Sequence, residues 1–422
     1  MTSEIKQRIE RIRRGEVPER YVKTALGLAP ANWKRYTFGD IYTERKEPGD
    51  ENLPLLMVSI HSGVSDGEVD AAELPKQVKR IEDKSQYKKA VSGDLVFNMM
   101  RAWQGAIGTV RTTGMVSPAY IVAEPNDKAY PLFMDYYSRT PQMINQIDRQ
   151  SYGVTDFRKR LYWDSFAPIS CTLPPIEEQQ KIAAILTTQD RVIELKEKRL
   201  AEKQRQKKYL MQQLLTGKKR LPGFSGEWKN IKLCEVLSER KEKNVEQNLR
   251  ICSVAVQKGV IDQIEHLGRS YAASDTSNYS VAHYGDIIYT KSPTGDFLYG
   301  IVKQNLLQET VAVSPLYGVF TPMTFGLGYF LHTYFQSAIC AQNYLLPIVQ
   351  KGAKNTINIT NDTFISSKLY LPLDVEEQKA IADTFIAADR EIELLRQDIR
   401  QEKQKKKALM QLLLTGIVRV TV

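Results

Sequence analysis

The chain has 422 residues, 42% hydrophobic and 26% charged, which suits a globular protein with two buried cores. Its formal charge of +10 favours a polyanionic partner, most simply nucleic acid. No apolar run approaches the 18 residues of a membrane span and residues 1–6 lack the apolar region of a signal peptide, so we expect a cytoplasmic location.

The first 28 residues predict a basic helix that runs to about residue 25. Ile5, Ile9 and Ile12 recur at helical spacing among arginines, and the Ala-Pro-Ala-Asn sequence at 29–32 breaks the pattern. A solvated face is the simplest role for this helix.

Residues 29–172 predict a mixed α and β domain. Short β-branched and aromatic runs, bounded by turn residues, predict strands at 56–60, 95–97, 107–110 and 120–123. A helix is expected from residue 132 to about 149. Its buried face would comprise Phe133, Tyr136, Tyr137, Met143, Ile144 and Ile147.

Residues 173–217 predict one long helix. Pro174 and Pro175 suit its first turn, and Gly217 suits a left-handed cap after its end. Apolar residues recur every seven positions, as in a coiled coil, except that Lys207 interrupts the row. The apolar positions of this row are Leu186, Ile193, Leu200 and Leu214.

Residues 218–370 repeat the landmarks of the first domain. Trp228-Lys229 corresponds to Trp33-Lys34, at an offset of 195. A Gly-Asp pair and a Val-Ser-Pro triplet recur in the same order, ending at Asp94 and Pro118 in the first copy and at Asp286 and Pro315 in the second. We therefore expect two domains with the same frame.

A second long helix, at 371–418, repeats the first. At an offset of 199, 19 of the 41 aligned pairs from Glu177 to Gly217 are identical. Asp374 and Glu377 have the spacing of a capping box, and Gly416 repeats the glycine cap. A period this long indicates a duplicated domain, and the apolar seams predict that the two helices pack on each other. The fold class is therefore α+β, with two mixed domains, two long helices and an internal repeat.

The loops between the repeated landmarks differ. Residues 98–105 of the first domain stand where the second has residues 290–296, and residues 152–160 stand where it has 351–358. All four segments are rich in polar, basic or aromatic residues. One scaffold thus presents two different surfaces.

These features together resemble the specificity subunit of type I restriction-modification systems over nearly the whole chain. The Leu-Pro, Glu-Glu-Gln and Leu-Leu-Thr-Gly signatures of both long helices, with the Gly-Asp and Val-Ser-Pro landmarks, carry the resemblance. It implies that each globular unit is a target recognition domain that reads one half of a bipartite DNA sequence. It also implies that the long helices form an antiparallel coiled coil with pseudo-twofold symmetry, which sets the spacer and docks methyltransferase subunits, two by expectation.

The variable loops supply the DNA-contacting candidates that this resemblance requires. Arginine, lysine and amide side chains suit base edges, and lysines suit phosphates. Candidates for base contact are Arg101, Gln104, Arg158 and Arg160 in the first domain, and Lys291, Thr294, Lys354, Asn355 and Asn358 in the second. Candidates for phosphate contact are Lys88, Lys89, Lys159 and Lys351. The expected partner-binding residues of the helices are Glu177, Glu178, Gln179, Leu214, Glu376, Glu377, Gln378 and Leu413.

Catalytic motifs of the expected complex do not occur in the sequence. It contains neither an Asn-Pro-Pro-Tyr or Asp-Pro-Pro-Tyr loop nor a Walker loop, and its four cysteines have no zinc-ligand spacing. We therefore expect a non-catalytic chain that binds no metal or cofactor. Partner subunits would use S-adenosylmethionine, ATP and Mg²⁺ for adenine-N6 methylation of double-stranded DNA and for restriction by translocating subunits.

Two alternatives remain open at this point. One is a coiled-coil scaffold for protein assembly that does not bind a specific DNA sequence. The other is the recognition half of a single-chain restriction or modification enzyme, which the duplicated elements at both ends of the chain disfavour.

Overall fold

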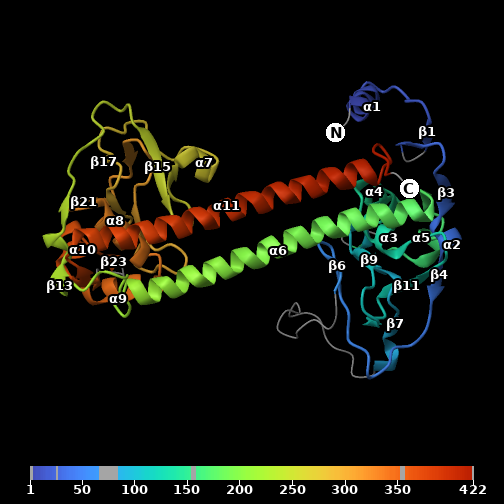
Figure 1. Cartoon of the computed structure of the whole chain (residues 1–422), viewed down its shortest axis with the longest axis horizontal. Coiled ribbons are helices and arrows are strands. Elements are labelled where there is room, and N and C mark those ends of the chain that lie inside the picture. Colours follow the sequence, from blue (N-terminus) through green and yellow to red (C-terminus); the bar gives the residue numbers. More distant parts are fainter. Residues whose placement is uncertain (1–2, 25–26, 66–83, 154–157, 352–356, 421–422) are drawn as a thin grey trace. The chain divides into compact units, whose positions relative to one another are not determined.

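The computed structural model describes residues 3–24, 27–65, 84–153, 158–351 and 357–420. The chain divides into two compact units, each containing part of both long helices (Figure 1). Unit 1 comprises Met1–Leu195 and Ile399–Val422, and unit 2 comprises Lys196–Asp398. Both units mix helices and strands, in agreement with the predicted α+β class.

The centre of unit 1 is a four-stranded antiparallel sheet in the order β4-β11-β8-β9. Its strands are β4 Tyr42–Arg45, β8 Leu95–Asn98, β9 Ile107–Thr109 and β11 Tyr120–Pro125. Helices α3 (Pro131–Tyr137) and α4 (Pro141–Gln150) bury Phe133, Met143 and Ile147 in the same core. The first part of the long helix α6 completes this core, since Leu186 is fully buried in it.

Smaller elements surround the sheet of unit 1. Strand β12 pairs with β3 just before α6 begins, and β10 pairs with β7. The bounds are α1 Ser3–Arg13, β1 Tyr21–Thr24, β2 Gly27–Pro30, β3 Lys34–Thr37, α2 Phe38–Ile41, β5 Val58–Ser59, β6 Gly63–Val64, η1 Lys84–Gln86, β7 Lys88–Ala90, η2 Ala102–Gln104, β10 Gly114–Val116, α5 Trp163–Phe166 and β12 Ser170–Leu173.

Unit 2 repeats the sheet of unit 1 with the order β14-β21-β18-β19. Strand β24 pairs with β13 before the second long helix, as β12 pairs with β3. A further sheet of unit 2, β16-β15-β20-β17, has four strands, whereas the sheet β10-β7 of unit 1 has two. The bounds are β13 Trp228–Lys232, η4 Leu233–Glu235, β14 Leu237–Glu239, β15 Arg250–Ala255, β16 Gly259–Asp262, α7 Gln263–Leu267, β17 Ser280–Ala282, β18 Ile287–Tyr289, β19 Val302–Gln304, β20 Val311–Val313, β21 Gly318–Pro322, α8 Phe325–Tyr334, α9 Ala338–Leu345, η5 Leu346–Ile348, β22 Gln350–Lys351, β23 Ile357–Asn358, α10 Asn361–Ser366 and β24 Lys368–Pro372.

The two long helices are α6 Ile176–Leu214 and α11 Val375–Leu413. Both predicted glycine caps are confirmed, since Gly217 and Gly416 have φ angles of +68° and +71°. Asp374 caps α11 by accepting a hydrogen bond from the Glu376 N–H at 2.9 Å. The predicted capping box is only half formed, because the Glu377 carboxylate binds an arginine and a tryptophan instead.

Side-chain contacts join the two long helices within each unit. In unit 2, Lys196, Lys203 and Lys207 pair in that order with Asp398, Glu391 and Asp389, so the two segments run antiparallel. In unit 1, Asp190 of α6 pairs with Lys406 of α11 at 2.5 Å. The prediction that the helices pack on each other holds within each unit.

Two predicted helices differ from the structure. The N-terminal helix ends at Arg13, because Gly15 adopts a left-handed φ of +80° and Tyr21 begins strand β1. The helix expected at 132–149 is two helices, because Pro141 at the first turn of α4 cannot continue α3. Thr140 caps α4 with its side-chain oxygen.

Two features are absent from the described residues. None of their helices has the length and apolar character needed to cross a bilayer. No cluster of histidine, cysteine, aspartate or glutamate side chains among them could hold a metal ion.

Candidate nucleic-acid interface

The Gly-Asp landmark of each unit anchors the strand that precedes its first variable loop. Asp94, 1% exposed, accepts a hydrogen bond from Arg45 Nε at 2.8 Å and one from the Val91 N–H. Burial raises the pKa of Asp94, and Arg45 opposes that shift. Asp286 makes the equivalent pair with Arg240 Nε at 2.6 Å. Because these aspartates are buried and paired, they position the loops and are not themselves available to DNA.

The loop after β8 in unit 1 is a compact, well-supported turn. Gly105, with a φ of +105°, ends the 3₁₀ turn η2, and the Trp103 indole donates to the Met100 carbonyl at 3.0 Å. Arg101 and Gln104 remain exposed to solvent. Both predicted side chains can therefore reach a ligand from a rigid support.

The second variable segment of unit 1 lies beside this turn. Tyr152 and Arg160 form a bridge with backbone hydrogen bonds of 3.1 and 2.9 Å, and the next residue, Leu161, donates to the Met99 carbonyl at 2.8 Å. Arg158 and Arg160 are exposed. The structure thus gathers four predicted base-contacting residues, Arg101, Gln104, Arg158 and Arg160, on two adjoining segments.

Three predicted phosphate-binding lysines have partners within unit 1. Lys159 donates to Asp148 at 2.9 Å and lies over the Trp103 ring. Lys88 donates to the Tyr120 carbonyl at 2.8 Å, and burial lowers its pKa. Lys89 pairs with Glu47 at 2.9 Å. Each would have to exchange or share an internal contact to bind a phosphate.

Exposed aromatic and thioether side chains at the same place were not among the predicted contacts. Tyr152 and Tyr162 are 59% and 37% exposed, and their ring centroids lie 5.8 Å apart. Met100 is 46% exposed beside Arg101. Large apolar residues in an otherwise polar loop are the sequence signal that could have identified them.

The first variable loop of unit 2 forms a different turn. Thr294, at its exposed tip, exchanges two backbone hydrogen bonds of 3.0 Å with Phe297, whose side chain is buried. Lys291 is half-buried in a left-handed conformation with a φ of +60°, and burial lowers its pKa. Thr294 is therefore better exposed than Lys291 for a direct contact.

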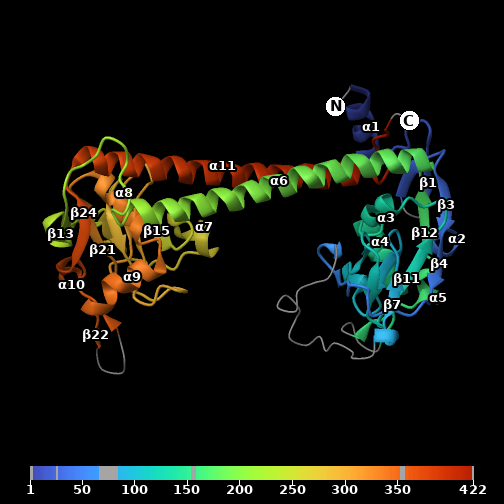
Figure 2. The same cartoon turned by 60° about the horizontal axis from the view of Figure 1, so that its bottom comes forward.

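The second variable segment of unit 2 contains two short antiparallel strands, β22 and β23. Gln350 of β22 pairs with Asn358 of β23, as Tyr152 pairs with Arg160 in unit 1. Figure 2 shows β22 on the side of unit 2 opposite α11. Lys351 and Asn358 belong to these strands, and Lys354 and Asn355 lie outside the described residues.

The repeated glutamates at the helix starts form two equivalent buried clusters. In unit 1, Arg419 binds both carboxylate oxygens of Glu178 at 2.7 Å, and the Trp33 indole donates to Oε2 at 3.3 Å. In unit 2, Arg220 and Trp228 bind Glu377 in the same way. Glu178 and Glu377 are 0% and 1% exposed, so they cannot reach a partner directly.

The other predicted partner-binding residues fall into two groups. Gln179 and Gln378 are buried and hydrogen-bonded to the segments before α3 and α8, through Tyr130 N–H and Thr324 Oγ1. Buried positions also include Leu214 and Leu413. Glu177 and Glu376 are exposed and remain candidates for direct contact.

Comparisons with known proteins add to this geometry. A family model described as "Type I restriction modification DNA specificity domain" matches residues 72–204 and 226–403, once in each repeat. The type I restriction enzyme MjaVIII specificity subunit of Methanocaldococcus jannaschii is 24% identical over 371 residues, 80% of this chain and 83% of the relative. A putative type I restriction enzyme MjaX specificity subunit of that organism is 22% identical over 443 residues, 95% of this chain and 97% of the relative. The solved S subunit of a type I restriction-modification system from M. genitalium has the same fold, with a TM-score of 0.52 and 11% identity, covering 93% of this chain and 97% of that structure.

Proposed function

Because the chain belongs to the family of type I restriction-modification specificity subunits, we propose that its two units read the two halves of a bipartite DNA target. Specificity subunits recognise the DNA sequence for the enzyme complex, and they are not themselves catalytic. Each unit would contain one target recognition domain. This domain comprises residues 29–172 in unit 1 and residues 218–370 in unit 2.

One observation carries this proposal: equivalent buried supports hold unlike exposed loops. The Arg45–Asp94 and Arg240–Asp286 pairs support the same strand in each sheet. The loop that follows holds Arg101 and Gln104 in unit 1 but a threonine-tipped turn in unit 2. Different donors and acceptors on one frame would read different base pairs.

The long helices would set the spacer between the half-sites. A duplicated chain can adopt approximate twofold symmetry, which matches the symmetry of duplex DNA. An antiparallel coiled coil would then fix how far apart the two recognition surfaces lie. Ion pairs join α6 to α11 within each unit, as such a coiled coil requires.

The same helices would dock methyltransferase subunits, two by expectation. Exposed Glu177 and Glu376 follow equivalent strands and start equivalent helices, so they could form equivalent contacts. Glu178, Gln179, Glu377 and Gln378 would act indirectly, by holding the helix starts against their units. Partner subunits would supply S-adenosylmethionine-dependent adenine methylation and ATP- and Mg²⁺-dependent cleavage in the cytoplasm.

A domain exchange with methylome sequencing tests the proposal. Residues 29–172 are replaced by the first recognition domain of another specificity subunit, and both chains are expressed with the methyltransferase. We expect a split adenine-methylated motif in which only one half changes. Reciprocal exchange of residues 218–370 is the control and should change only the other half.

Two results would contradict it. A motif that changes in both halves after one exchange would show that the units do not read independently. Stable assembly without any methylated motif, together with no sequence preference in a gel shift, would instead favour the coiled-coil scaffold.

A further inference from the structure

Three exposed apolar side chains lie where the two variable segments of unit 1 adjoin. Met100, Tyr152 and Tyr162 are 46%, 59% and 37% exposed. The residues before Met100 and Tyr162 are joined by a backbone hydrogen bond of 2.8 Å, and the centroids of the two tyrosine rings lie 5.8 Å apart. Together these three residues form the apolar patch of unit 1. Exposed apolar surface in a polar loop is typical of a binding site.

The internal repeat shows that the apolar patch belongs to unit 1 alone. Tyr162 and its counterpart are each the N-cap residue of a short helix. Tyr152 and its counterpart each pair with the residue eight positions later. Met100 and its counterpart each lie six residues after the aspartate of the Gly-Asp landmark. In unit 2 these positions hold polar residue types, namely Ser292, Gln350 and Thr360.

The charges around the apolar patch favour DNA as its ligand. Arg101 follows Met100 directly, and Arg158 and Arg160 lie between the two tyrosines in the sequence. All three arginines are exposed, so they can bind phosphates or guanine edges. An apolar group among them can contact the apolar part of a base pair. In the major groove this part is the C5-methyl group, which only thymine carries among the four standard bases.

We propose that the apolar patch contacts the C5-methyl group of a thymine in the half-site read by unit 1. Tyr152 and Tyr162 supply most of the contact and thereby select thymine at that position, while the arginines bind the polar groups beside it. The inference rests on the proposed function, because it requires that unit 1 reads one half of the target.

The spacing of the two rings favours a methyl group over an inserted base. A base fits between two rings only if their planes lie about 7 Å apart, which is twice the roughly 3.5 Å of a carbon–carbon contact. The Tyr152 and Tyr162 centroids are 5.8 Å apart and their planes are inclined by 35°. No base fits between them, so the outer faces and edges of the rings make the contact.

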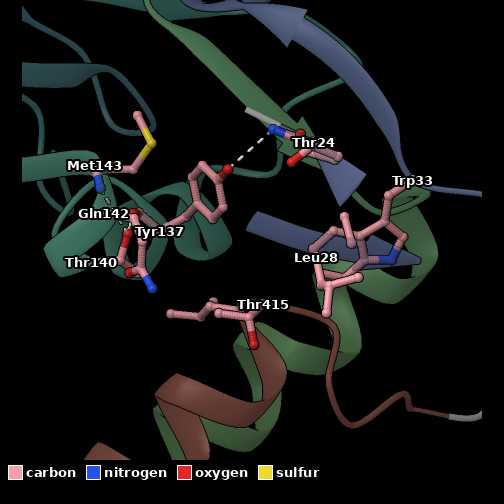
Figure 3. Close-up of a pocket in the computed structure, with 11 residues that line it drawn as sticks. Thr24, Leu28, Trp33, Tyr137, Thr140, Gln142, Met143 and Thr415 are labelled. Carbon is pink, nitrogen blue, oxygen red and sulfur yellow. Dashed lines mark hydrogen bonds between the residues drawn. The ribbon is translucent and has the colours of Figure 1, made fainter. Parts of the chain in front are cut away.

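A pocket elsewhere in unit 1 is too small to receive a base. Figure 3 shows this pocket between Trp33 and Tyr137, and its volume is about 50 Å³. This is room for about four water molecules if one requires about 10–15 Å³, and it is too little for a nucleobase. The exposed apolar patch is therefore the better place for a base contact.

Uracil substitution tests the contact, because uracil keeps every hydrogen-bonding group of thymine and lacks only the methyl group. The full chain, assembled with its methyltransferase, is titrated with the target duplex. It is also titrated with duplexes in which each thymine of the unit 1 half-site is replaced in turn by uracil. We expect about fourfold weaker binding at one position, which is the effect of one buried methyl group.

Two variants assign this effect to the rings. Tyr152→Ser combined with Tyr162→Ser should make thymine and uracil equivalent at that position, and serine also suits the N-cap site of Tyr162. Tyr152→Phe combined with Tyr162→Phe is the matched control and should keep the difference, because the ring makes the contact. Uracil in the other half-site should have the same effect in the wild type and in both variants.

Two results would overturn the inference. One is equal binding of the thymine duplex and every uracil duplex by the wild type, and the other is a uracil effect that persists in the double serine variant. In both cases a preference for the target over a scrambled half-site still supports the proposed function. Loss of that preference in the wild type would contradict the proposed DNA reading, and the methyl contact with it.

Discussion

Single residues in this chain differ in how much their substitution should lower the free energy of unfolding. Glu178 is fully buried, and Arg419 is the cation that binds both its oxygens. Removal of one member of a buried ion pair leaves the other charge desolvated without compensation. Burial gives Glu178, the second glutamate of the repeated Glu-Glu-Gln signature, a structural role, whereas exposed Glu177 stays a predicted partner contact.

Arg419→Met should therefore destabilise unit 1. We expect a loss of about 2–4 kcal/mol in the free energy of unfolding, measured with urea. Arg390→Met, an exposed change on α11, is the control and should cost less than about 0.5 kcal/mol. Equal effects of the two substitutions would show that the Glu178 cluster is not a structural anchor.

Arg101→Ala and Arg158→Ala should alter recognition without altering stability. Both side chains are exposed on the adjoining variable segments of unit 1, so we expect weaker binding and relaxed preference in one half-site only. Binding to duplexes mutated in each half-site separately measures this. Intact preference in both variants would refute the assignment of the first reading surface.

His332 should make unit 2 sensitive to acid. Burial, followed by the nearby Lys303 and Lys207, lowers its pKa to about 3, so the folded state holds a neutral imidazole that accepts a hydrogen bond from the Gln304 N–H. Between pH 6.5 and about 3 the unfolded state binds the additional proton, so stability falls as the pH falls through this window. His332→Asn should remove up to about 2 kcal/mol of the loss between pH 7 and pH 5, measured by urea unfolding. His266→Asn, at an exposed site, should leave the pH dependence unchanged.

At the scale of elements, Lys207, which interrupts the apolar row of α6, and its equivalent Lys406 in α11 have a structural explanation. Lys406 binds Asp190 across the helix pair in unit 1, and Tyr136 donates to the same aspartate at 2.6 Å. The repeat places Lys207, Asp389 and Tyr329 in the same arrangement in unit 2. A polar contact inside an apolar seam can fix the register of two helices.

A double-mutant cycle on Lys406→Met and Asp190→Asn tests the coupling between the helices. We expect a coupling energy of about 1–2 kcal/mol by urea unfolding, since both side chains are partly shielded and share a third partner. The Arg191–Glu194 pair, exposed on α6 alone, is the matched control and should couple by less than about 0.5 kcal/mol. Coupling no greater than in the control would argue against a register-fixing role.

At the scale of the whole molecule, many of the lysines and arginines pair with the chain's own carboxylates, which leaves the net charge of +10 unchanged but holds those side chains inside the fold. Two basic runs lie at residues 203–208 of α6 and 403–407 of α11, and their Lys203, Lys207 and Lys406 form ion pairs with the opposite helix. We therefore expect the variable loops to contribute more to phosphate binding than these runs.

The salt dependence of DNA affinity measures whether the variable loops or the basic runs of the helices contact phosphates. Replacing the exposed Lys208 and Lys407 by glutamine should leave the slope of log K against log salt nearly unchanged, because each real phosphate contact contributes about one unit. Replacing Lys89 and Lys159, two predicted phosphate contacts of unit 1, by glutamine should lower the slope. A drop of about two units in the variant of Lys208 and Lys407 would place the helix ends on the DNA.

The sequence alone determined the duplication, the two long helices and the family, because repeats, heptad spacing and glycine caps are local patterns. Local patterns also misled where two signals competed, as when apolar periodicity at 132–149 concealed the break that Pro141 imposes. Only the tertiary structure decided which charged residues are buried, since Glu178 meets Arg419 across 241 residues and exposed Glu177 differs from it by one position. It likewise decided that residues 98–105 adjoin residues 158–161, because such contacts depend on how distant segments pack.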